Sequence, residues 1–499
     1  VDVRLNAHND INNTTGIIQG SSSLLAVAGR DINATTTLAD AQSVSGDNRF
    51  SRTTIDSVSG IYVQGDDGRL TLHSGRDITL SGAQVVASGE RGEVQLVAGR
   101  DIQLNDVTTA WRDNLVWDAD NALNQSQSIS NNSEVTGKGS VTLSAGHDLS
   151  ARGALLSSGA ALNLGAGNNV TLAAGENSQT LDERHKVTGS SSWLSKTTTR
   201  TQDNVSRQTA QGSELNGDSV GITAGNDLTV RGSSVAGSGD VALRAGNDLR
   251  IDTQDEYNSE QHLKQEKKSG LMSSGGIGVS YGTQSVKTTD TAADVTRAGS
   301  TVGSVDGDLT RRQGDNLTVN GSDLIAGQDM ALSGKNVAIT AAENQSQQTH
   351  VVEQKTSGLT LALSGAAGSA LNSVVQATQD AKSAGSSRLQ ALQGVKAALS
   401  GVQAGQAARL DAAQGNDPAN NNTVGVSLSY GSQSSKSTQR SEQTTAQGSS
   451  LTAGRDLSIT AREGDLNAVG SQLKAGNDVA LSASRDLNLI SAENTSLLE

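Results

Sequence analysis

LTAGRDLSITA, residues 451–461, contains two runs of alternating apolar and polar residues, separated by Gly454, Arg455 and Asp456. Alternation with a period of two predicts a strand on each side of a corner, with one apolar face. Gly454 can take the positive φ of a tight corner, and the Asp456 carboxylate can accept hydrogen bonds from backbone N–H groups. Because one such unit is too small to bury its apolar face, it must stack on copies of itself.

Copies of this corner recur along the chain, and 21 positions separate Gly146 from Gly167. A coil of about 20 residues made of short strands and Gly corners predicts an all-β fold, a right-handed parallel β-helix in which each corner superposes on the next. Ten or so coils would make a rod roughly 50 Å long. The residues expected at the structural corners are Gly29, Asp31, Gly75, Asp77, Gly99, Asp101, Gly146, Asp148, Gly225, Asp227, Gly246, Asp248, Gly454, Asp456, Gly476 and Asp478.

Composition agrees with a narrow solenoid and excludes several functions. Aromatic residues make up 2% of the chain, there are 56 Gly and one Pro, and there is no Cys. The net charge of −14, with scattered Lys and Arg, argues against a nucleic-acid partner. The chain opens within the repeat pattern at Val1 and ends at Glu499 without a polar cap, which favours a piece excised from a longer protein.

No pattern of catalytic, cofactor-binding or metal-binding residues is found, and no small-molecule substrate is expected. The six His have no metal-site spacing, and His185, His262 and His350 are interpreted as surface residues of hairpins. The corner Asp residues repeat in every coil, whereas a glycan-cleaving site would need a local cluster of carboxylates. We interpret them as turn residues rather than calcium ligands, because the nonapeptide of calcium-binding β-rolls is missing.

Long polar excursions interrupt the coils with matched outgoing and returning residues, for example QHLKQEKKSGL and then YGTQSVKTT. This matched pattern predicts projecting antiparallel β-hairpin arms, with disordered loops as the alternative. Two earlier interruptions, at 39–59 and 105–138, are loops or hairpins. The expected division is β-helix repeats with two loop excursions at 1–177, a first arm at 178–211, coils at 212–257, a second arm at 258–313, coils at 314–344, a third arm at 345–447 and coils at 448–499.

Two features of the arms bear on function. Within the third arm, residues 366–413 are rich in Ala, Gln and Leu with a helical period, which predicts an inserted α-helical hairpin. Elsewhere in the arms, short stretches alternate apolar and polar residues, a pattern that suits a membrane strand or a hairpin lying on the rod. The candidate membrane or partner contacts are Trp193, Ile277, Val279, Tyr281, Val426, Leu428 and Tyr430.

The recurrent AGRDL and AGNDL corners, together with VGVSLSYGSQSSKST at 424–438, resemble the haemagglutinin repeats of filamentous-haemagglutinin-type exoproteins. These are two-partner-secreted adhesins and contact-dependent growth-inhibition effectors of Gram-negative bacteria. The resemblance implies secretion to the bacterial cell surface through an outer-membrane β-barrel partner. It also implies contact with a target-cell outer membrane or surface receptor. The secretion, pretoxin and toxin domains of such proteins are not found in this sequence.

Three functions compete at this stage. The first is a toxin-delivery module whose arms engage an outer membrane, and the second is a passive adhesin stalk that the arms merely decorate. The third is a β-helical glycan-cleaving enzyme. Repeated arms with alternating faces favour the delivery module, because a plain stalk has no use for them.

Overall fold

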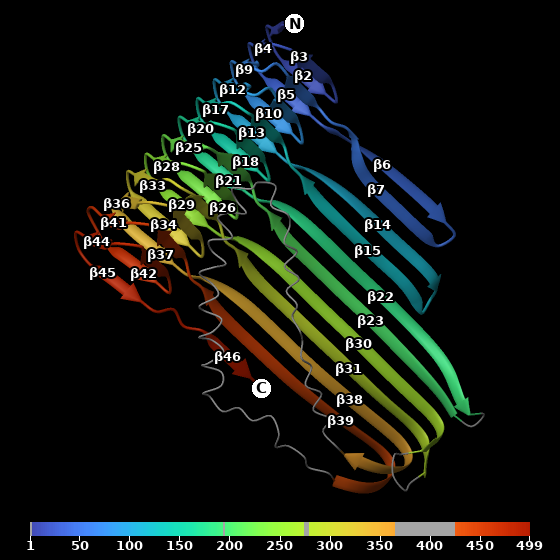
Figure 1. The fold of residues 1–499 in the computed structure, drawn as a ribbon. Coiled ribbons are helices and arrows are strands. Elements are labelled where there is room, and N and C mark those ends of the chain that lie inside the picture. The colour runs from blue at the N-terminus through green and yellow to red at the C-terminus, as the bar shows by residue number, and fades with distance from the viewer. Residues whose placement is uncertain (1, 193–194, 274–278, 365–424) are drawn as a thin grey trace.

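The computed structural model describes residues 2–192, 195–273, 279–364 and 425–499. In these residues the chain is all-β and winds into a parallel β-helix of twelve coils, which confirms the predicted fold class (Figure 1). The expected helical hairpin at 366–413 lies outside the described residues. No described helix is long and apolar enough to cross a membrane.

Each coil contributes one strand to each of three parallel sheets, except the last coil, which has no strand in the third sheet. The first sheet consists of β1 (Asp2–Ala7), β4 (Ser23–Ala28), β9 (Arg69–Ser74), β12 (Glu93–Ala98), β17 (Val141–Ala145), β20 (Ala161–Ala166), β25 (Ser219–Ala224), β28 (Val241–Ala245), β33 (Leu309–Gln313), β36 (Met330–Gly334), β41 (Leu457–Ala461) and β44 (Val479–Ala483). The second consists of β2 (Ile11–Thr14), β5 (Ile32–Thr35), β10 (Ile78–Ser81), β13 (Ile102–Asn105), β18 (Leu149–Arg152), β21 (Val170–Ala173), β26 (Leu228–Arg231), β29 (Leu249–Asp252), β34 (Asn316–Asn320), β37 (Asn336–Thr340), β42 (Leu466–Val469) and β45 (Leu487–Ile490).

The third sheet consists of β3 (Ile17–Gly20), β8 (Gly60–Val63), β11 (Gln84–Ala87), β16 (Glu134–Gly137), β19 (Leu155–Ser158), β24 (Glu214–Gly217), β27 (Ser234–Gly237), β32 (Thr301–Ser304), β35 (Asp323–Ala326), β40 (Ser450–Ala453) and β43 (Gln472–Ala475). A fourth, antiparallel sheet projects from the rod, and we call it the arm sheet. In spatial order it consists of β46 (Thr495–Leu498), β39 (Gly425–Gln447), β38 (Ala342–Ser364), β31 (Val279–Ala298), β30 (Gln254–Ser273), β23 (Ser195–Gln211), β22 (Gly175–Ser192), β15 (Asn121–Asn131), β14 (Val107–Asp118), β7 (Asn48–Ser57) and β6 (Thr37–Ser45).

The interior of the rod is a stack of aliphatic side chains. Inward residues alternate with outward ones on every strand, so that Leu72, Leu96 and Leu143 stack in register on successive coils. The stacked residues are Leu, Ile, Val and Ala with one Met, and each is almost fully buried. Two long polar side chains also face inward, Arg311 and Gln313 of β33, which are 1% and 4% exposed.

The corner glycines are required by a close approach between coils. A Cβ atom on Gly454 would lie 1.9 Å from the carbonyl oxygen of Gly327 in the preceding coil. The same overlap, at 2.2 Å or less, would occur along the column formed by Gly29, Gly75, Gly99, Gly146, Gly167, Gly225 and Gly246. The positive φ expected at Gly454 is therefore wrong, since this residue is not among those with positive φ. Tight stacking along the rod axis explains the glycine instead.

The corner Asp residues form two columns rather than the single column expected. Asp31 to Asp248 lie between the first and second sheets, where each carboxylate accepts a hydrogen bond from the backbone N–H of the next coil; the Asp31 Oδ1 to Asp77 N distance is 3.2 Å. Asp456 and Asp478 lie at a different corner, between the third and first sheets, in a column with Asp329. The same Gly-x-Asp phrase thus serves two corners of the coil.

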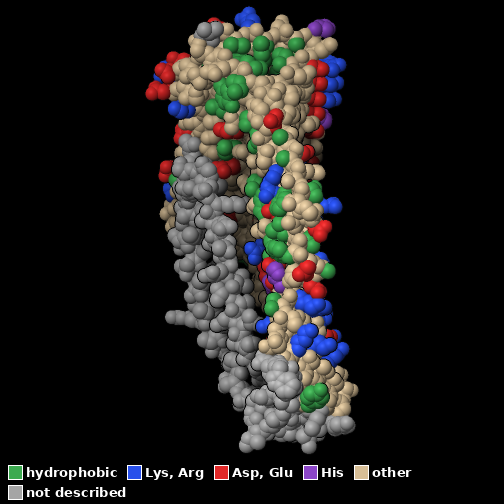
Figure 2. Space-filling view, turned by 90° about the vertical axis from the view of Figure 1, so that its right-hand side faces the viewer, with side chains coloured by type: hydrophobic (Ala, Val, Ile, Leu, Met, Phe, Trp, Pro, Cys, Tyr) green, Lys and Arg blue, Asp and Glu red, His purple; other side chains and the backbone are tan. Residues whose placement is uncertain are grey.

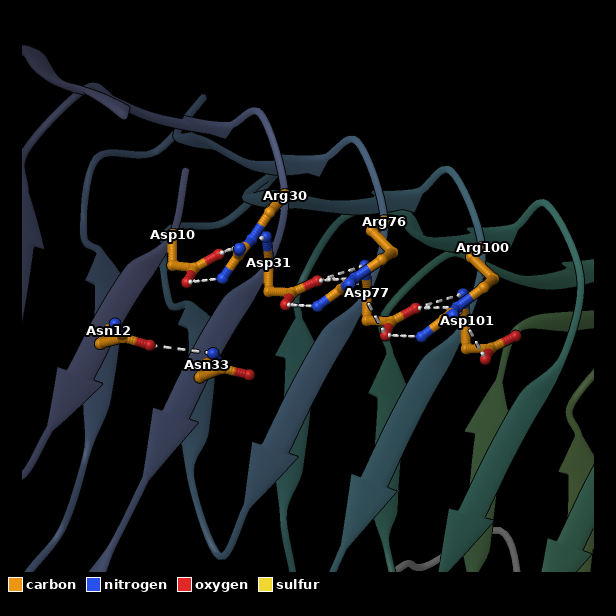
Figure 3. Close-up of polar contacts among 9 residues, drawn as sticks. All are labelled: Asp10, Asn12, Arg30, Asp31, Asn33, Arg76, Asp77, Arg100 and Asp101. Atoms are coloured by element: carbon orange, nitrogen blue, oxygen red, sulfur yellow. Dashed lines mark hydrogen bonds and ion pairs between the residues drawn. The ribbon is translucent and has the colours of Figure 1, made fainter. Parts of the chain in front are cut away.

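Arginines reinforce the first of these columns (Figure 3). Arg76 donates to both carboxylate oxygens of Asp31, at 2.9 and 2.5 Å, and Arg30 and Arg100 make the same contacts with Asp10 and Asp77. The hydrogen bond from Arg76 is the main reason that the pKa of Asp31 lies below its ordinary value. Stacked coils are therefore linked along the rod by charge-assisted hydrogen bonds.

This column predicts different costs for two substitutions of Asp31. Asp31→Ala removes both acceptors and should lower the free energy of unfolding by about 1–2 kcal/mol. Asp31→Asn should cost less than half as much, because Asn169 already accepts the N–H of Asp227 in another coil. Urea denaturation at neutral pH measures both. As the pH falls through the lowered pKa of Asp31, the gap between wild type and Asp31→Asn should close; equal costs for Ala and Asn would contradict this role.

The third corner, between the second and third sheets, alternates between two forms. In six coils it is a tight left-handed turn with φ between 53° and 59°, at Thr15, Gly82, Gly153, Gly232, Gly321 and Gly470. In the intervening coils the chain leaves at this corner to form an arm. A buried serine follows the corner in both forms. The backbone N–H of Ser213 donates to Ser233 Oγ, and the backbone N–H of Ser233 donates to Ser300 Oγ. These serines satisfy backbone groups that the branching would otherwise leave buried and unpaired.

The alternation has a geometric cause. Neighbouring strands in a sheet lie about 4.8 Å apart, so two stacked coils advance the rod by the same distance as one hairpin advances the arm sheet. Arms on every second coil can therefore pair side by side, and β15 with β22, β23 with β30, and β31 with β38 do so in antiparallel register. The arms form one continuous sheet for this reason (Figure 1).

Candidate partner-contact surface on the arm sheet

The arms lengthen steadily from the N-terminal to the C-terminal end of the rod. The first hairpin, β6–β7, has strands of 9 and 10 residues, whereas β38 and β39 have 23 each. The two early interruptions of the sequence contain β6–β7 and β14–β15, which belong to the same sheet as the later arms. The longest arms therefore belong to the C-terminal half of the rod (Figure 1).

A row of four glycines crosses the longest arms near their ends, and we call it the glycine crease. Gly270 pairs with Gly282, Gly282 with Gly358, and Gly358 with Gly431. Gly270, Gly358 and Gly431 have φ of 106°, 116° and 133°, values that residues other than glycine rarely adopt. A Cβ on Gly282 would lie 2.0 Å from the Ser357 carbonyl oxygen. In the sequence these glycines lie in the segments KSGL, YGTQ, TSGL and YGSQ. The alignment of the four glycines in one row depends on the pairing of strands from different arms.

Directly beyond the crease, the next row of the ladder consists of Leu271, Tyr281, Leu359 and Tyr430. We call this the tip row. Farther out, Leu361 pairs with Leu428 and Leu363 with Val426. Tyr281 is 67% exposed. The register thus brings together apolar residues from four strands, which belong to two successive arms.

Four of the predicted contact residues besides Tyr281 lie in described strands: Val279 in β31 and Val426, Leu428 and Tyr430 in β39. Val279, Tyr281 and Tyr430 lie on strands that the β38 ladder connects. Trp193 and Ile277 lie outside the described residues. The predicted contacts therefore stay a proposal, but those that the structure describes gather at one end of the arm sheet.

Two of the arm histidines, His262 and His350, belong to a row in which they alternate with Asp residues. Asp203 pairs with His262, His262 with Asp290, and Asp290 with His350. His262 Nδ1 lies 2.7 Å from Asp203 Oδ1, a hydrogen bond that raises the pKa of His262. His185 makes its contact with Glu183, on its own strand, at 2.5 Å. The contacts of His262 with Asp203 and of His350 with Asp290 join neighbouring arms, whereas that of His185 lies within one strand.

Among the residues that the structure describes, one group of three has ligand atoms close enough to hold a metal ion, namely Asp101, His147 and Asp148. His147 Nδ1 lies 3.0 Å from Asp148 and 3.4 Å from Asp101. The residue occupies the corner position that Arg76 and Arg100 hold in the two preceding coils. It therefore fits the ion-pair column described above, and we assign it no metal.

The repeats of this chain match a known protein family. A family model described as "Hemagglutinin repeat" matches residues 119–199, 194–307 and 428–497, more than half of the chain. The chain belongs to the hemagglutinin repeat family. Each matched range includes strands of the rod and strands of the arm sheet. In this hemagglutinin repeat protein the arms are accordingly part of the repeat and not insertions into it.

Curated relatives of this hemagglutinin repeat chain carry names of toxins. It is 44% identical over 333 residues to a 16S rRNA endonuclease CdiA of Enterobacter cloacae and 46% identical over 285 residues to a toxin CdiA of Yersinia pestis. These matches cover 66% and 57% of the chain but only 10% and 9% of the relatives. A tRNA nuclease CdiA of Escherichia coli is 40% identical over 65% of the chain. No solved structure matches the chain.

Proposed function

We propose that this chain is a non-enzymatic segment of a large exoprotein secreted to the surface of a Gram-negative bacterium, and that its arm sheet engages the outer membrane of a target cell during toxin delivery. An outer-membrane β-barrel partner would export it. The nuclease and toxin names of the relatives support the context, since the chain spans about one tenth of the first of them. We assign the activities in these names to parts of the relatives that this chain does not match.

The observation that carries the proposal is the shape of the arm sheet. A sheet whose arms grow from 9 to 23 residues and end in apolar rows carries those rows on strands of the arm sheet, outside the three sheets of the rod. Alternating apolar residues on paired strands suit contact with a membrane. The alternative, a passive adhesin stalk, needs the rod but gives no reason for the tip row.

A triple substitution of Val426, Leu428 and Tyr430 to Ser in the full-length exoprotein tests this role. It removes roughly 4.5–9 kcal/mol of potential apolar burial, at about 1.5–3 kcal/mol per side chain. Surface display should be unchanged, because these residues lie in β39 of the arm sheet and not in the three sheets of the rod. Toxin delivery into target cells, measured by competition between strains, should fall by about an order of magnitude or more.

The matched control changes three exposed apolar residues of the shortest arm, Leu38, Val44 and Ile55, to Ser. This variant should deliver toxin at the wild-type level. Normal delivery by the tip variant would support the stalk instead. If the tip variant fails to reach the surface, Tyr281→Ser, at a residue 67% exposed, repeats the test with less risk to folding.

A further inference from the structure

One face of the arm sheet carries a concentration of basic residues just inside the glycine crease. Lys186 pairs with Arg200, Arg200 with Gln265, Gln265 with Lys287, Lys287 with Glu353, and Glu353 with Lys436. Directly paired residues share a face of the sheet, and so do residues two positions apart on one strand. The basic residues that share this face, which we call the cationic face, are Arg184, Lys186, Lys196, Arg200, Lys267, Lys287, Lys355 and Lys436.

Few acidic groups balance this face. Asp120 contacts Lys186 and Arg200, and Glu353 lies 3.9 Å from Lys287 and 3.6 Å from Lys436. Among the described residues, no acidic side chain lies within ion-pair distance of Arg184, Lys196, Lys267 and Lys355, all of which are exposed. Such an excess of positive charge stands out in a chain whose net charge is −14. Figure 2 shows Lys and Arg gathered toward the outer part of the arm sheet.

The opposite face differs in its charges. Over the same stretch of the arms it carries Lys264 and Lys268 with Glu266, and the row of Asp203, His262 and Asp290 adjoins them. Lys268 Nζ lies 2.7 Å from Glu266 Oε1. Positive charge is therefore segregated to one side of a single-layer sheet, as a surface that docks on an anionic partner requires.

A hollow of about 470 Å³ lies in the cationic face. Its charged lining comprises Arg184, Lys186, Arg200, Lys287 and Lys355, with Asp120 and Glu353, and Gln265 and Ser285 provide uncharged hydrogen-bonding groups. Arg and Lys side chains around a hollow of this kind bind phosphate oxygens by charge-assisted hydrogen bonds. Because charged and amide side chains make up most of its lining, an anionic group fits this hollow better than an apolar ligand.

We propose that the cationic face binds the phosphate-bearing head groups of anionic lipids. This inference rests on the proposed function and names the chemistry that the arm sheet recognises. Two neighbouring features favour a lipid surface over nucleic acid. The rows of the cationic face hold no aromatic residue on which bases could stack. Immediately beyond the crease, the exposed Tyr281 belongs to the apolar tip row, and aromatic residues beside basic ones are typical of membrane interfaces.

The test measures binding of the whole chain to vesicles of phosphatidylcholine containing about one third phosphatidylglycerol, with pure phosphatidylcholine vesicles beside them. The variant Arg184→Gln, Lys267→Gln, Lys355→Gln removes three exposed cations that lack acidic partners. Each basic residue at an anionic membrane strengthens binding about fivefold, so the variant should bind the anionic vesicles roughly 100-fold more weakly. Binding by the wild type should also weaken as salt is added.

The matched control is Arg207→Gln, Lys264→Gln, Lys268→Gln, which removes the same charge from the opposite face. It should bind as the wild type does. Equal losses in both variants, equal binding to neutral vesicles, or displacement of vesicles by a DNA duplex would overturn the proposal. Inorganic phosphate at equal phosphate concentration should compete poorly; effective competition would indicate a site for free phosphate instead. Vesicle binding by the cationic face together with normal toxin delivery by its variant would uphold this inference and count against the proposed function.

Discussion

Replacing Arg311 with Leu should raise the free energy of unfolding by about 2–4 kcal/mol, because it removes a charged group from the core. Arg311 is 1% exposed, and its three guanidinium nitrogens have no hydrogen-bond partner among the described residues. In the stack it lies between Leu243 of β28 and Leu332 of β36, so a Leu would continue the column. Hydrogen exchange of β28, β33 and β36 measures the local gain, which suits a rod that does not unfold as a single cooperative unit.

The pH dependence of this effect has a definite sign. Burial lowers the pKa of Arg311 to about 9, so the folded chain holds this proton less tightly than the unfolded chain does. The penalty is full below that pKa and shrinks as the pH rises above it, so wild type should approach Arg311→Leu in stability above about pH 9. The control is Arg312→Leu, at the exposed neighbour, where we expect a change within about 0.5 kcal/mol. No gain from Arg311→Leu would mean that the guanidinium is solvated or paired in solution.

Gly454→Ala should destabilise the C-terminal coils by more than about 2 kcal/mol, although alanine is the smallest possible addition. The new Cβ would lie 1.9 Å from the Gly327 carbonyl oxygen and 2.8 Å from its carbon. Both are backbone atoms, so relief requires the coils to separate and weakens the hydrogen bonds between Gly454 and Ala326 and between Arg455 and Gln328. Urea denaturation followed by hydrogen exchange of β40 and β41 measures the loss.

Gly165→Ala provides the control for this substitution. Gly165 lies in β20, its φ is not positive, and nothing lies within 4 Å of the position its Cβ would take. Alanine there should be neutral or stabilise the strand by about 0.5–1 kcal/mol, because glycine loses more conformational freedom on folding. Equal effects at the two positions would show that close stacking is not what requires the corner glycine.

Much of the rod could be predicted from the sequence, because each coil repeats the same local chemistry. Alternation around Gly-x-Asp indicated the strands, and the spacing of Gly146 and Gly167 gave the length of a coil. The same local chemistry does not reveal which corner of the coil each Gly-x-Asp motif occupies. Gly454 and Gly246 look alike because both corners need a residue without a side chain and an acceptor for the next coil, yet they lie at different edges of the coil.

The candidate surface was less accessible, because it depends on pairing between arms. Matched segments around His262 and Tyr281 indicated a hairpin, but the sequence of a segment does not show which strand of another arm it pairs with. The cationic face arises when Lys267 of one arm and Lys355 of the next fall in the same row. The glycine crease is also a property of the assembled sheet, although each of its glycines is visible in the sequence.

The alternation of turn and arm at the third corner also limits how such a protein can change in length. Losing a single coil would bring two arms to adjacent levels, where a hairpin about 10 Å wide would have to fit into half that spacing. Gaining one coil would open a gap between arms and expose unpaired strand edges that invite aggregation. The repeating unit that can be gained or lost is therefore a pair of coils with its hairpin. Duplications and deletions in this family should add or remove whole units of this kind.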